Sequence, residues 1–284
     1  MKTKSFLSAL LLTLAALLPL QAQAFWSLFG GDEDKKVEPL LQVCAVPQLY
    51  GPLTELASLQ QAHPSSVFKG QFALHFDTAG GLYSKIANKT ERCDVLLSNS
   101  ERMPILLVRS QLSEPSSMHA FAKAPLVLYS SDPALFARGA EPVIKQKLKS
   151  LALPKASLTP VGFAAAEVVS SKTFPTNYLK HHLYRAEQEY QVFAMVSSGN
   201  VQAGFVTLPL VIGESGSYWQ IPADYYPEIC YYAAVLKGSM QLQGLNFIEM
   251  LKTDARAQQS LRTGGFLPLN EDVESGPYDK LPGR

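Results

Sequence analysis

The chain has few cysteines and little charge of either sign. Three of its 284 residues are cysteines and none forms a C-x-x-C pair, which excludes a disulfide-dense scaffold and a thiolate metal or redox site. Lysine and arginine (25) nearly balance aspartate and glutamate (24), which excludes a polycationic nucleic-acid binder and an acidic disordered chain. Apolar residues make up 47% of the sequence. This composition is typical of a globular protein, and the length suits one large or two medium α/β domains.

Common enzyme motifs are also missing. The sequence contains no G-x-x-x-x-G-K-[ST], no G-x-G-x-x-G and no H-E-x-x-H. Ser217 stands where a nucleophile elbow would need its second glycine. His181 and His182 are adjacent, so on a helix they would point about 100° apart and could not readily chelate one ion. We therefore predict that the protein is not an enzyme and uses neither a cofactor nor a metal.

Cys44, Cys93 and Cys230 lie in or beside apolar segments. Buried free thiols are the default interpretation of such positions. One disulfide is the alternative, and a reactive nucleophile is not predicted.

The first 24 residues have the pattern of a cleavable signal peptide. Lys2 and Lys4 precede an apolar run over residues 6–18, and an Ala-Gln-Ala pattern ends at Ala24. The run is shorter than the ~20 apolar residues that a membrane span needs. We predict cleavage after Ala24 and a soluble, periplasmic protein without a lipid anchor. Residues 25–38 are predicted to be a flexible linker, and residues 269–284 a disordered tail.

Between these ends, strands and helices alternate with short loops, which is typical of open, mainly parallel sheets flanked by helices. The predicted strands are residues 40–46, 71–76, 94–98, 125–130, 158–164, 201–208 and 228–236. The predicted helices begin at Pro52, cover 82–88, lie within 176–198 and cover 243–261.

Polar residues and glycines follow three consecutive strands: Gln48, Thr78 to Gly81, and Ser98 to Ser100. Each taken alone is most simply a helix cap. In open α/β sheets, however, ligands bind beyond the carboxyl ends of the strands, where free N–H groups of helices are exposed. Together these turns therefore predict the rim of a ligand site.

Several segments resemble the periplasmic molybdate-binding proteins of ABC transporters. The first is VCAVPQLYGPLTELA (43–57), followed by FDTAGGLYSKI (76–86) and CDVLLSNS (93–100). Residues 186–206 are similar to the helix and strand of the family's second domain, and residues 247–266 to its closing helix and terminal Gly-Phe. The resemblance extends over roughly residues 40–268, in the correct order.

This resemblance implies a two-lobed periplasmic-binding-protein fold of type II, with each lobe a mainly parallel sheet flanked by helices. Lobe one would be discontinuous, with residues 39–121 and 237–268. Lobe two would be residues 122–236, with hinge strands at both ends near 122–129 and 228–236. The ligand would be captured in the cleft between the lobes.

The resemblance also implies the ligand-binding residues, with several departures from the family. Gln48 replaces a serine at the first turn, and Thr78, Ala79 and Gly80 occupy the second turn. Thr207 replaces a tyrosine, Glu189 stands at a main-chain contact, and Ser171, with Ser170, would supply a hydroxyl at a helix start. A carboxylate such as Glu189 or Asp77 about 4 Å from an anion would repel it by about 4 kcal/mol at an effective dielectric near 20. The alternative is that both carboxylates point to solvent or pair with Lys180 or Arg185.

The predicted function is a periplasmic solute-binding protein of an ABC uptake system, with molybdate or tungstate about as well favoured as another small polar solute. The alternative is an exported non-transport binding or sensory module of the same fold with a different small polar ligand. The predicted partners are the solute or oxyanion and the membrane subunit of an ABC transporter. No nucleic-acid partner is predicted, and the chain is expected to be a monomer.

Overall fold

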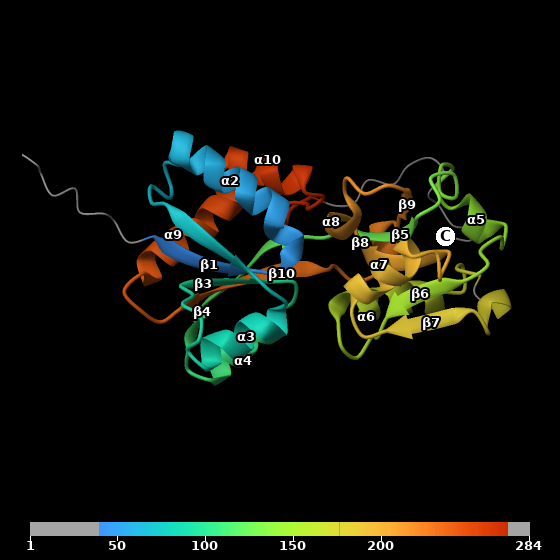
Figure 1. Ribbon diagram of the computed structural model, residues 1–284, viewed down its shortest axis with the longest axis horizontal. Helices are drawn as coiled ribbons and strands as arrows, with labels where there is room; N and C mark the ends of the chain where they lie inside the picture. The colour runs from blue at the N-terminus through green and yellow to red at the C-terminus, as the bar shows by residue number, and fades with distance from the viewer. Residues whose placement is uncertain (1–39, 176, 272–284) are drawn as a thin grey trace, which may run out of the picture. The chain divides into compact units, whose positions relative to one another are not determined.

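The computed structural model describes residues 40–175 and 177–271 (Figure 1). These residues belong to one compact unit, Leu40–Arg284. The predicted signal peptide (1–24), the predicted linker (25–38) and residues 272–284 of the predicted tail lie outside the described residues. Within the described ranges, no helix is both long enough and apolar enough to cross a membrane.

The first of two five-stranded sheets has the order β2-β1-β3-β10-β4. Strand β1 is parallel to β2 and β3, and β10 is antiparallel to both of its neighbours, so β10 alone runs against the other four. The sheet is therefore mainly parallel, as predicted. Its strands are β1 (Leu41–Ala45), β2 (Phe72–Phe76), β3 (Val95–Ser98), β4 (Ser113–Lys123) and β10 (Cys230–Leu236).

Helices cover both faces of the first sheet (Figure 1). On one face, α10 packs against α2 and α9, and on the other α3 packs against α4. Thr78 caps α3, because its hydroxyl accepts from the Gly81 N–H over 3.1 Å. These helices are α2 (Tyr50–Ala62), α3 (Ala79–Ala87), α4 (Arg102–Arg109), α9 (Gln241–Thr253) and α10 (Ala255–Thr263).

The second sheet repeats the same plan, with the order β7-β6-β8-β5-β9. Here β5 is the one strand that runs against the other four. Alternate residues of β8 face opposite sides: Phe205 packs with Phe174, whereas Gly204 lies against Val192 and Val196. The strands are β5 (Leu126–Ser130), β6 (Leu151–Pro154), β7 (Leu183–Ala186), β8 (Ala203–Thr207) and β9 (Ser217–Gln220), flanked by α6 (Pro160–Ser170) and α7 (Glu189–Ser197).

Short helical turns complete the described chain. They are α5 (Glu141–Ile144), α8 (Leu208–Val211), and the 3-10 turns η1 (Pro47–Leu49), η2 (Asn177–Leu179) and η3 (Ala223–Tyr225). Turn η1 contacts α8, so a loop of the first sheet meets a loop of the second.

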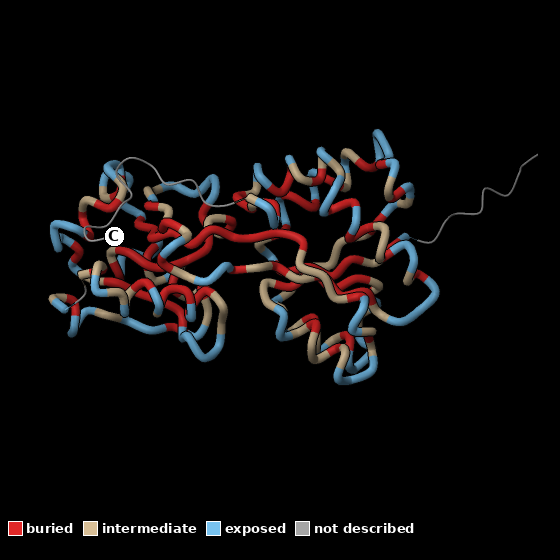
Figure 2. The backbone as a smooth tube through the Cα atoms, turned by 180° about the vertical axis from the view of Figure 1, so that it is seen from behind, coloured by how far each residue is buried: buried red, intermediate tan, exposed pale blue. Residues whose placement is uncertain are grey.

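The chain passes between the sheets twice (Figure 1). It leaves the first sheet between β4 and β5, and it returns between β9 and β10. Residues 121–130 are all buried (Figure 2). The buried Lys123 ammonium pairs with Glu228 Oε1 over 2.8 Å, and the Ala124 N–H donates to the Ile229 carbonyl. The two passages therefore run side by side and are bonded to each other.

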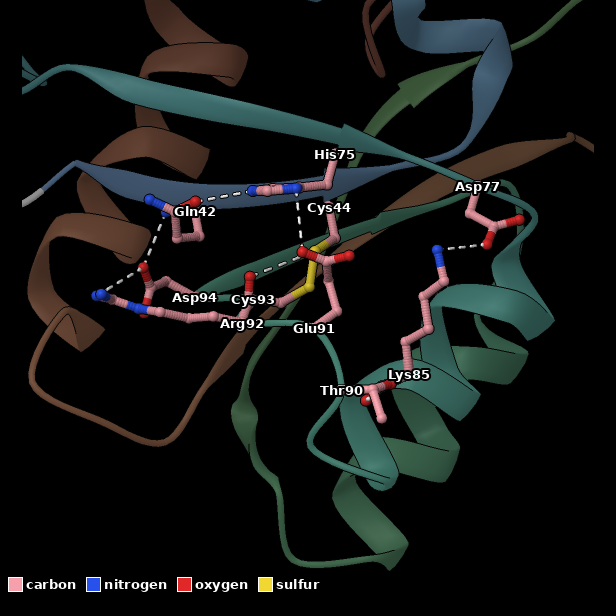
Figure 3. The surroundings of a disulfide bond; sticks show 10 residues. All are labelled: Gln42, Cys44, His75, Asp77, Lys85, Thr90, Glu91, Arg92, Cys93 and Asp94. Carbon is pink, nitrogen blue, oxygen red and sulfur yellow. Dashed lines mark hydrogen bonds and ion pairs between the residues drawn. A yellow bond between two sulfur atoms is a disulfide. The ribbon is translucent and has the colours of Figure 1, made fainter.

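A disulfide joins Cys44 of β1 to Cys93, just before β3, with Cα atoms 5.8 Å apart (Figure 3). The prediction that buried free thiols are the default is wrong for this pair, and Cys230 is the free cysteine of the described chain. Neighbouring strands bring the two sulfurs together, because residues 43–45 of β1 pair with 95–97 of β3. Disulfides persist in oxidising compartments, which agrees with an exported protein.

Polar side chains surround this disulfide (Figure 3). The His75 ring bonds Gln42 Oε1 over 2.8 Å and Glu91 over 3.1 Å. Asp94 accepts from the Gln42 N–H over 2.8 Å. These bonds cross β2, β1 and the segment before β3, and so tie one edge of the first sheet together.

Three predicted elements differ from the structure. Residues 158–164 are not a strand, because Thr159 caps α6 and Pro160 occupies its first position, which suits proline. The predicted helix within 176–198 is confined to α7, and β7 precedes it. The predicted helix 243–261 is two helices, because Asp254 ends α9 and its carboxylate caps α10.

Candidate functional site

Gln48 and Thr207, which were predicted to bind ligand, lie near each other although they belong to different sheets. Gln48 is in η1, directly after β1, and Thr207 is the last residue of β8. Both therefore stand at the carboxyl ends of strands, where open α/β sheets bind ligands. Glu189, the first residue of α7, lies between them and connects them by hydrogen bonds.

The Glu189 carboxylate accepts three hydrogen bonds. Gln48 Nε2 donates to Oε1 over 2.7 Å, and Thr207 donates to Oε2 from its N–H over 3.0 Å and from its hydroxyl over 2.9 Å. Glu189 is 3% exposed and Thr207 is fully buried. The expected alternative was that Glu189 faces solvent or pairs with Lys180 or Arg185. It is wrong, because the side chain is buried and its three hydrogen-bond donors come from the uncharged residues Gln48 and Thr207.

Burial makes this carboxylate unusually easy to protonate. Removal from water raises the pKa of Glu189 above its ordinary value of 4.5, while the hydrogen bonds from Thr207 and Gln48 lower it and offset part of the rise. A buried carboxylate bonded to neutral donors alone is costly to keep ionised. Such groups are common at functional sites, although structural networks also produce them.

Tyr231, which sequence reasoning missed, belongs to the same cluster. It lies in β10, is 1% exposed, and its hydroxyl has no hydrogen-bond partner among the described residues. Burial first, and then the nearby charge of Glu189, raise the pKa of Tyr231 well above its ordinary value, and the neighbouring Thr207 hydroxyl lowers it in part. Gln48 Oε1 is a second buried atom without a partner. We call Gln48, Glu189, Thr207 and Tyr231 the site cluster.

Tyr231 could not have been found from the sequence as a site residue. It lies within a long apolar strand, Cys230–Leu236, and nothing in its spacing separates it from the core aromatics. Its ring packs edge-on against Phe266 and Phe121, which is the ordinary role of an aromatic residue in a core. Only the position of its hydroxyl beside Glu189 identifies it.

The second turn stays at the surface. Thr78 and Gly80 are exposed, Ala79 is partly buried, and the Thr78 hydroxyl is used to cap α3. Asp77 pairs with Lys85 over 2.9 Å, and this hydrogen bond lowers the pKa of Asp77. This turn nevertheless lies next to the end of β1, because the Asp77 N–H donates to the Ala45 carbonyl.

Ser170 and Ser171 were expected at a helix start, and this expectation is wrong. They stand at the C-terminal end of α6, where the Ser171 hydroxyl bonds the Thr173 hydroxyl over 2.7 Å. The first residue of α6 follows the carboxyl end of β6, and β6 is parallel to β8. The start of α6, at Thr159, therefore shares the edge on which Thr207 lies, and Ser171 does not.

The site cluster can hold a solute by hydrogen bonding. It offers amide, hydroxyl and main-chain donors, one carboxylate, and two buried polar atoms that are free to accept or donate. Its members come from four elements and two sheets, so a solute bound among them would contact both sheets at once. Such convergence of a few polar groups is typical of small-molecule sites.

Comparisons with known proteins identify the family of the chain. The family of bacterial extracellular solute-binding proteins matches residues 41–267. The molybdate-binding protein ModA of Rhodobacter capsulatus is 31% identical over 195 residues, which cover 68% of this chain and 75% of the relative. ModA of Azotobacter vinelandii is 26% identical over 231 residues, 80% of this chain and 89% of the relative.

A solved structure shows the same fold. The periplasmic molybdate-binding protein of Azotobacter vinelandii superposes with a TM-score of 0.63 and 22% identity, covering 80% of this chain and 98% of that chain. The predicted fold of two lobes, each with a sheet flanked by helices, is thus confirmed. From the extent of the family match and the shared fold, this chain belongs to the family of bacterial extracellular solute-binding proteins.

Proposed function

We propose that this protein is the periplasmic binding subunit of an ABC uptake system and holds a small oxyanion at the site cluster. The hydrogen bond between Gln48 and Glu189 carries this proposal, because it joins the carboxyl-end edges of two sheets that are separately built. A solute that replaced or bridged this contact would be enclosed by both lobes. The membrane subunit of the transporter would then receive it from the closed complex.

The relatives direct the choice of solute class. Both curated relatives are named molybdate-binding proteins, so the tetrahedral oxyanions, of which molybdate and tungstate are examples, are the candidate class. Neutral donors such as the Gln48 amide and the Thr207 hydroxyl and N–H suit an anion. Tyr231 adds a hydroxyl that could donate to a solute. The site residues that we propose are therefore Gln48, Glu189, Thr207 and Tyr231, with the turn Thr78–Ala79–Gly80 at the rim.

Access to the site requires the two lobes to separate, because Glu189, Thr207 and Tyr231 are each at most 3% exposed. We place the lobe boundaries at the two chain passages, residues 124–125 and 221–229, in place of the expected 122–236 for lobe two, because β10 pairs within the first sheet. Lobe one would contain the segments before and after these passages, and lobe two the segment between them. Hinge motions of this kind use a few residues between rigid elements.

Export through a signal peptide cleaved after Ala24 is part of this proposal. Mass spectrometry of the protein recovered from the periplasmic fraction tests it, and we expect an N-terminus at Phe25. An intact Met1 in that fraction would contradict the cleavage.

A thermal-shift screen with molybdate, tungstate, sulfate, phosphate and neutral organic solutes tests the function. A solute present at 100 times its dissociation constant stabilises the folded state by about 2.7 kcal/mol, which a melting curve resolves. The Gln48→Ala variant should lose most of the ligand-induced shift, whereas Gln243→Ala, an exposed glutamine on α9, should keep it. If both variants respond alike to every ligand that binds, the solute is held elsewhere.

A further inference from the structure

The hydrogen bonds of the site cluster converge on the carboxylate of Glu189. The three hydrogen bonds that Gln48 and Thr207 make within the cluster all end on Glu189. Within the site cluster, two buried atoms are left without a partner: Gln48 Oε1, which can only accept, and the Tyr231 hydroxyl. An incoming solute therefore meets two acceptors, the amide oxygen and the carboxylate, and one hydroxyl.

The charge of Glu189 is not neutralised by its neighbours. Its three hydrogen bonds come from an amide, a hydroxyl and a main-chain N–H. At about 4 Å and an effective dielectric near 20, an ionised carboxylate would weaken the binding of a monoanionic group on the order of a thousand-fold. A fully ionised oxyanion such as sulfate or molybdate offers no proton that could relieve this repulsion.

An oxyanion that still carries a proton would interact quite differently with Glu189. Its O–H group can donate to the carboxylate, which replaces repulsion by a charge-assisted hydrogen bond. The remaining oxygens can accept from the Tyr231 hydroxyl and from the second N–H of the Gln48 amide, while Thr207 keeps its bonds to Glu189. Two charged acceptors that share one proton are thus compatible, whereas two without a proton are not.

We propose that Glu189 makes this site selective for oxyanions that carry a proton at neutral pH, such as hydrogen phosphate or hydrogen arsenate, over fully ionised ones. This selectivity rests on the proposed function, because it assumes that an oxyanion binds at the site cluster. Glu189 is the residue that would discriminate between the two classes of oxyanion. The shared chemistry is a tetrahedral oxyanion with an O–H group, whether free or part of a small phosphorylated compound.

The Glu189→Gln variant removes the charge and retains the shape. Its Oε1 can keep both bonds from Thr207, and its Nε2 can donate to Gln48 Oε1 once the Gln48 amide turns over. That turn would satisfy an atom that now lacks a partner. Glu187→Gln is the matched control. Glu187 lies two residues before Glu189 and its side chain is 65% exposed, so this variant removes the same charge outside the site cluster.

Isothermal titration of the mature chain with size-matched anion pairs tests the proposal. The pairs are phosphate against sulfate and arsenate against selenate, with molybdate and tungstate added as larger ionised anions. We expect the wild-type protein to prefer the proton-bearing member at least a hundred-fold. Glu189→Gln should reduce this preference at least ten-fold by gaining affinity for the ionised member, and Glu187→Gln should leave the preference unchanged.

One arm uses phosphate and a second uses a small phosphate monoester, which distinguishes the free anion from a phosphorylated solute.

The outcomes separate the two proposals. If the wild-type protein binds molybdate or sulfate tightly and Glu189→Gln does not tighten that binding, the selectivity is wrong while the oxyanion function stands. If no oxyanion binds to the wild-type protein, to Glu189→Gln or to Glu187→Gln, and both variants retain the wild-type melting temperature, the oxyanion function fails together with the selectivity. Binding of ionised anions by Glu189→Gln alone would support both.

Discussion

Gln48, which follows the first strand of one sheet, donates through Nε2 to Glu189 Oε1, at the start of a helix on the other sheet, over 2.7 Å. This bond links residues 141 positions apart in the chain. Because it ends on a buried carboxylate, it stabilises more than an ordinary surface contact between lobes would.

Removal of the Gln48 amide should destabilise the folded protein without ligand. Gln48→Ala leaves Glu189 Oε1 without its donor, and a buried charged acceptor left unsatisfied costs about 1–3 kcal/mol of unfolding free energy. Urea denaturation measures this loss. The exposed Gln243→Ala variant should change the unfolding free energy by less than about 0.5 kcal/mol. Equal stability of Gln48→Ala and the wild-type protein would mean that the lobes are separated in solution.

The Thr207 hydroxyl should contribute independently of the main chain. Thr207→Val keeps the volume and the N–H bond to Glu189 but removes the hydroxyl bond of 2.9 Å. We expect a loss of about 1–2 kcal/mol in unfolding free energy. Thr263→Val, at an exposed helix end where the hydroxyl bonds the Gln259 carbonyl, is the control and should be nearly neutral. A Thr207→Val protein as stable as this control would contradict the assigned bond.

Glu189 should make stability depend on pH in a predictable direction. Burial raises the pKa of Glu189 above 4.5 in the folded state, so the folded protein retains a proton that the unfolded chain releases between the ordinary and the raised pKa. The unfolding free energy therefore falls as pH rises through this window. Subtracting the pH profile of Glu189→Gln from that of the wild-type protein isolates this effect, since the other acidic groups are common to both and Tyr231, whose pKa responds to Glu189, titrates far above this window. Parallel profiles would show that the pKa of Glu189 is not raised.

The disulfide should stabilise the first lobe. Cys44 and Cys93 close a loop of 49 residues in sequence separation, and loss of such a bridge costs about 2–4 kcal/mol. The double variant Cys44→Ala/Cys93→Ala should show this loss in denaturation. Cys230→Ala, which removes the free cysteine, should change stability by less than 1 kcal/mol or so. A double variant as stable as Cys230→Ala would contradict the bridge.

Local signals were sufficient to predict most of the first lobe. The alternation of Phe72, Leu74 and Phe76 identifies β2 correctly, whereas the predicted helix 82–88 begins three residues too late, because Thr78 caps α3 and the helix starts at Ala79. Strands β4, β6, β7 and β9 were missed, because they are short, polar on one side or interrupted, and their register depends on neighbours far away in sequence. At 158–164, apolar content outweighed the stronger cap and proline signals of a helix start.

The candidate site could be predicted only in part. The resemblance to molybdate-binding proteins indicated Gln48, Glu189 and Thr207, and these three meet. It misplaced Ser171, because loose alignment cannot distinguish the start of α6 from its end. It could not indicate Tyr231, whose role depends on where one hydroxyl lies in the folded core.

Each sheet contains one reversed strand, β5 or β10, and each of these strands begins where the chain arrives from the other sheet. Both are bonded on two sides within their own sheet. A rotation of one lobe relative to the other would therefore break no strand pairing within either sheet. Its free-energy cost would depend on the few hydrogen bonds between the lobes. If the protein closes around a solute as we propose, a proton or a single hydrogen bond gained at Glu189 would shift the balance between the closed and the open form.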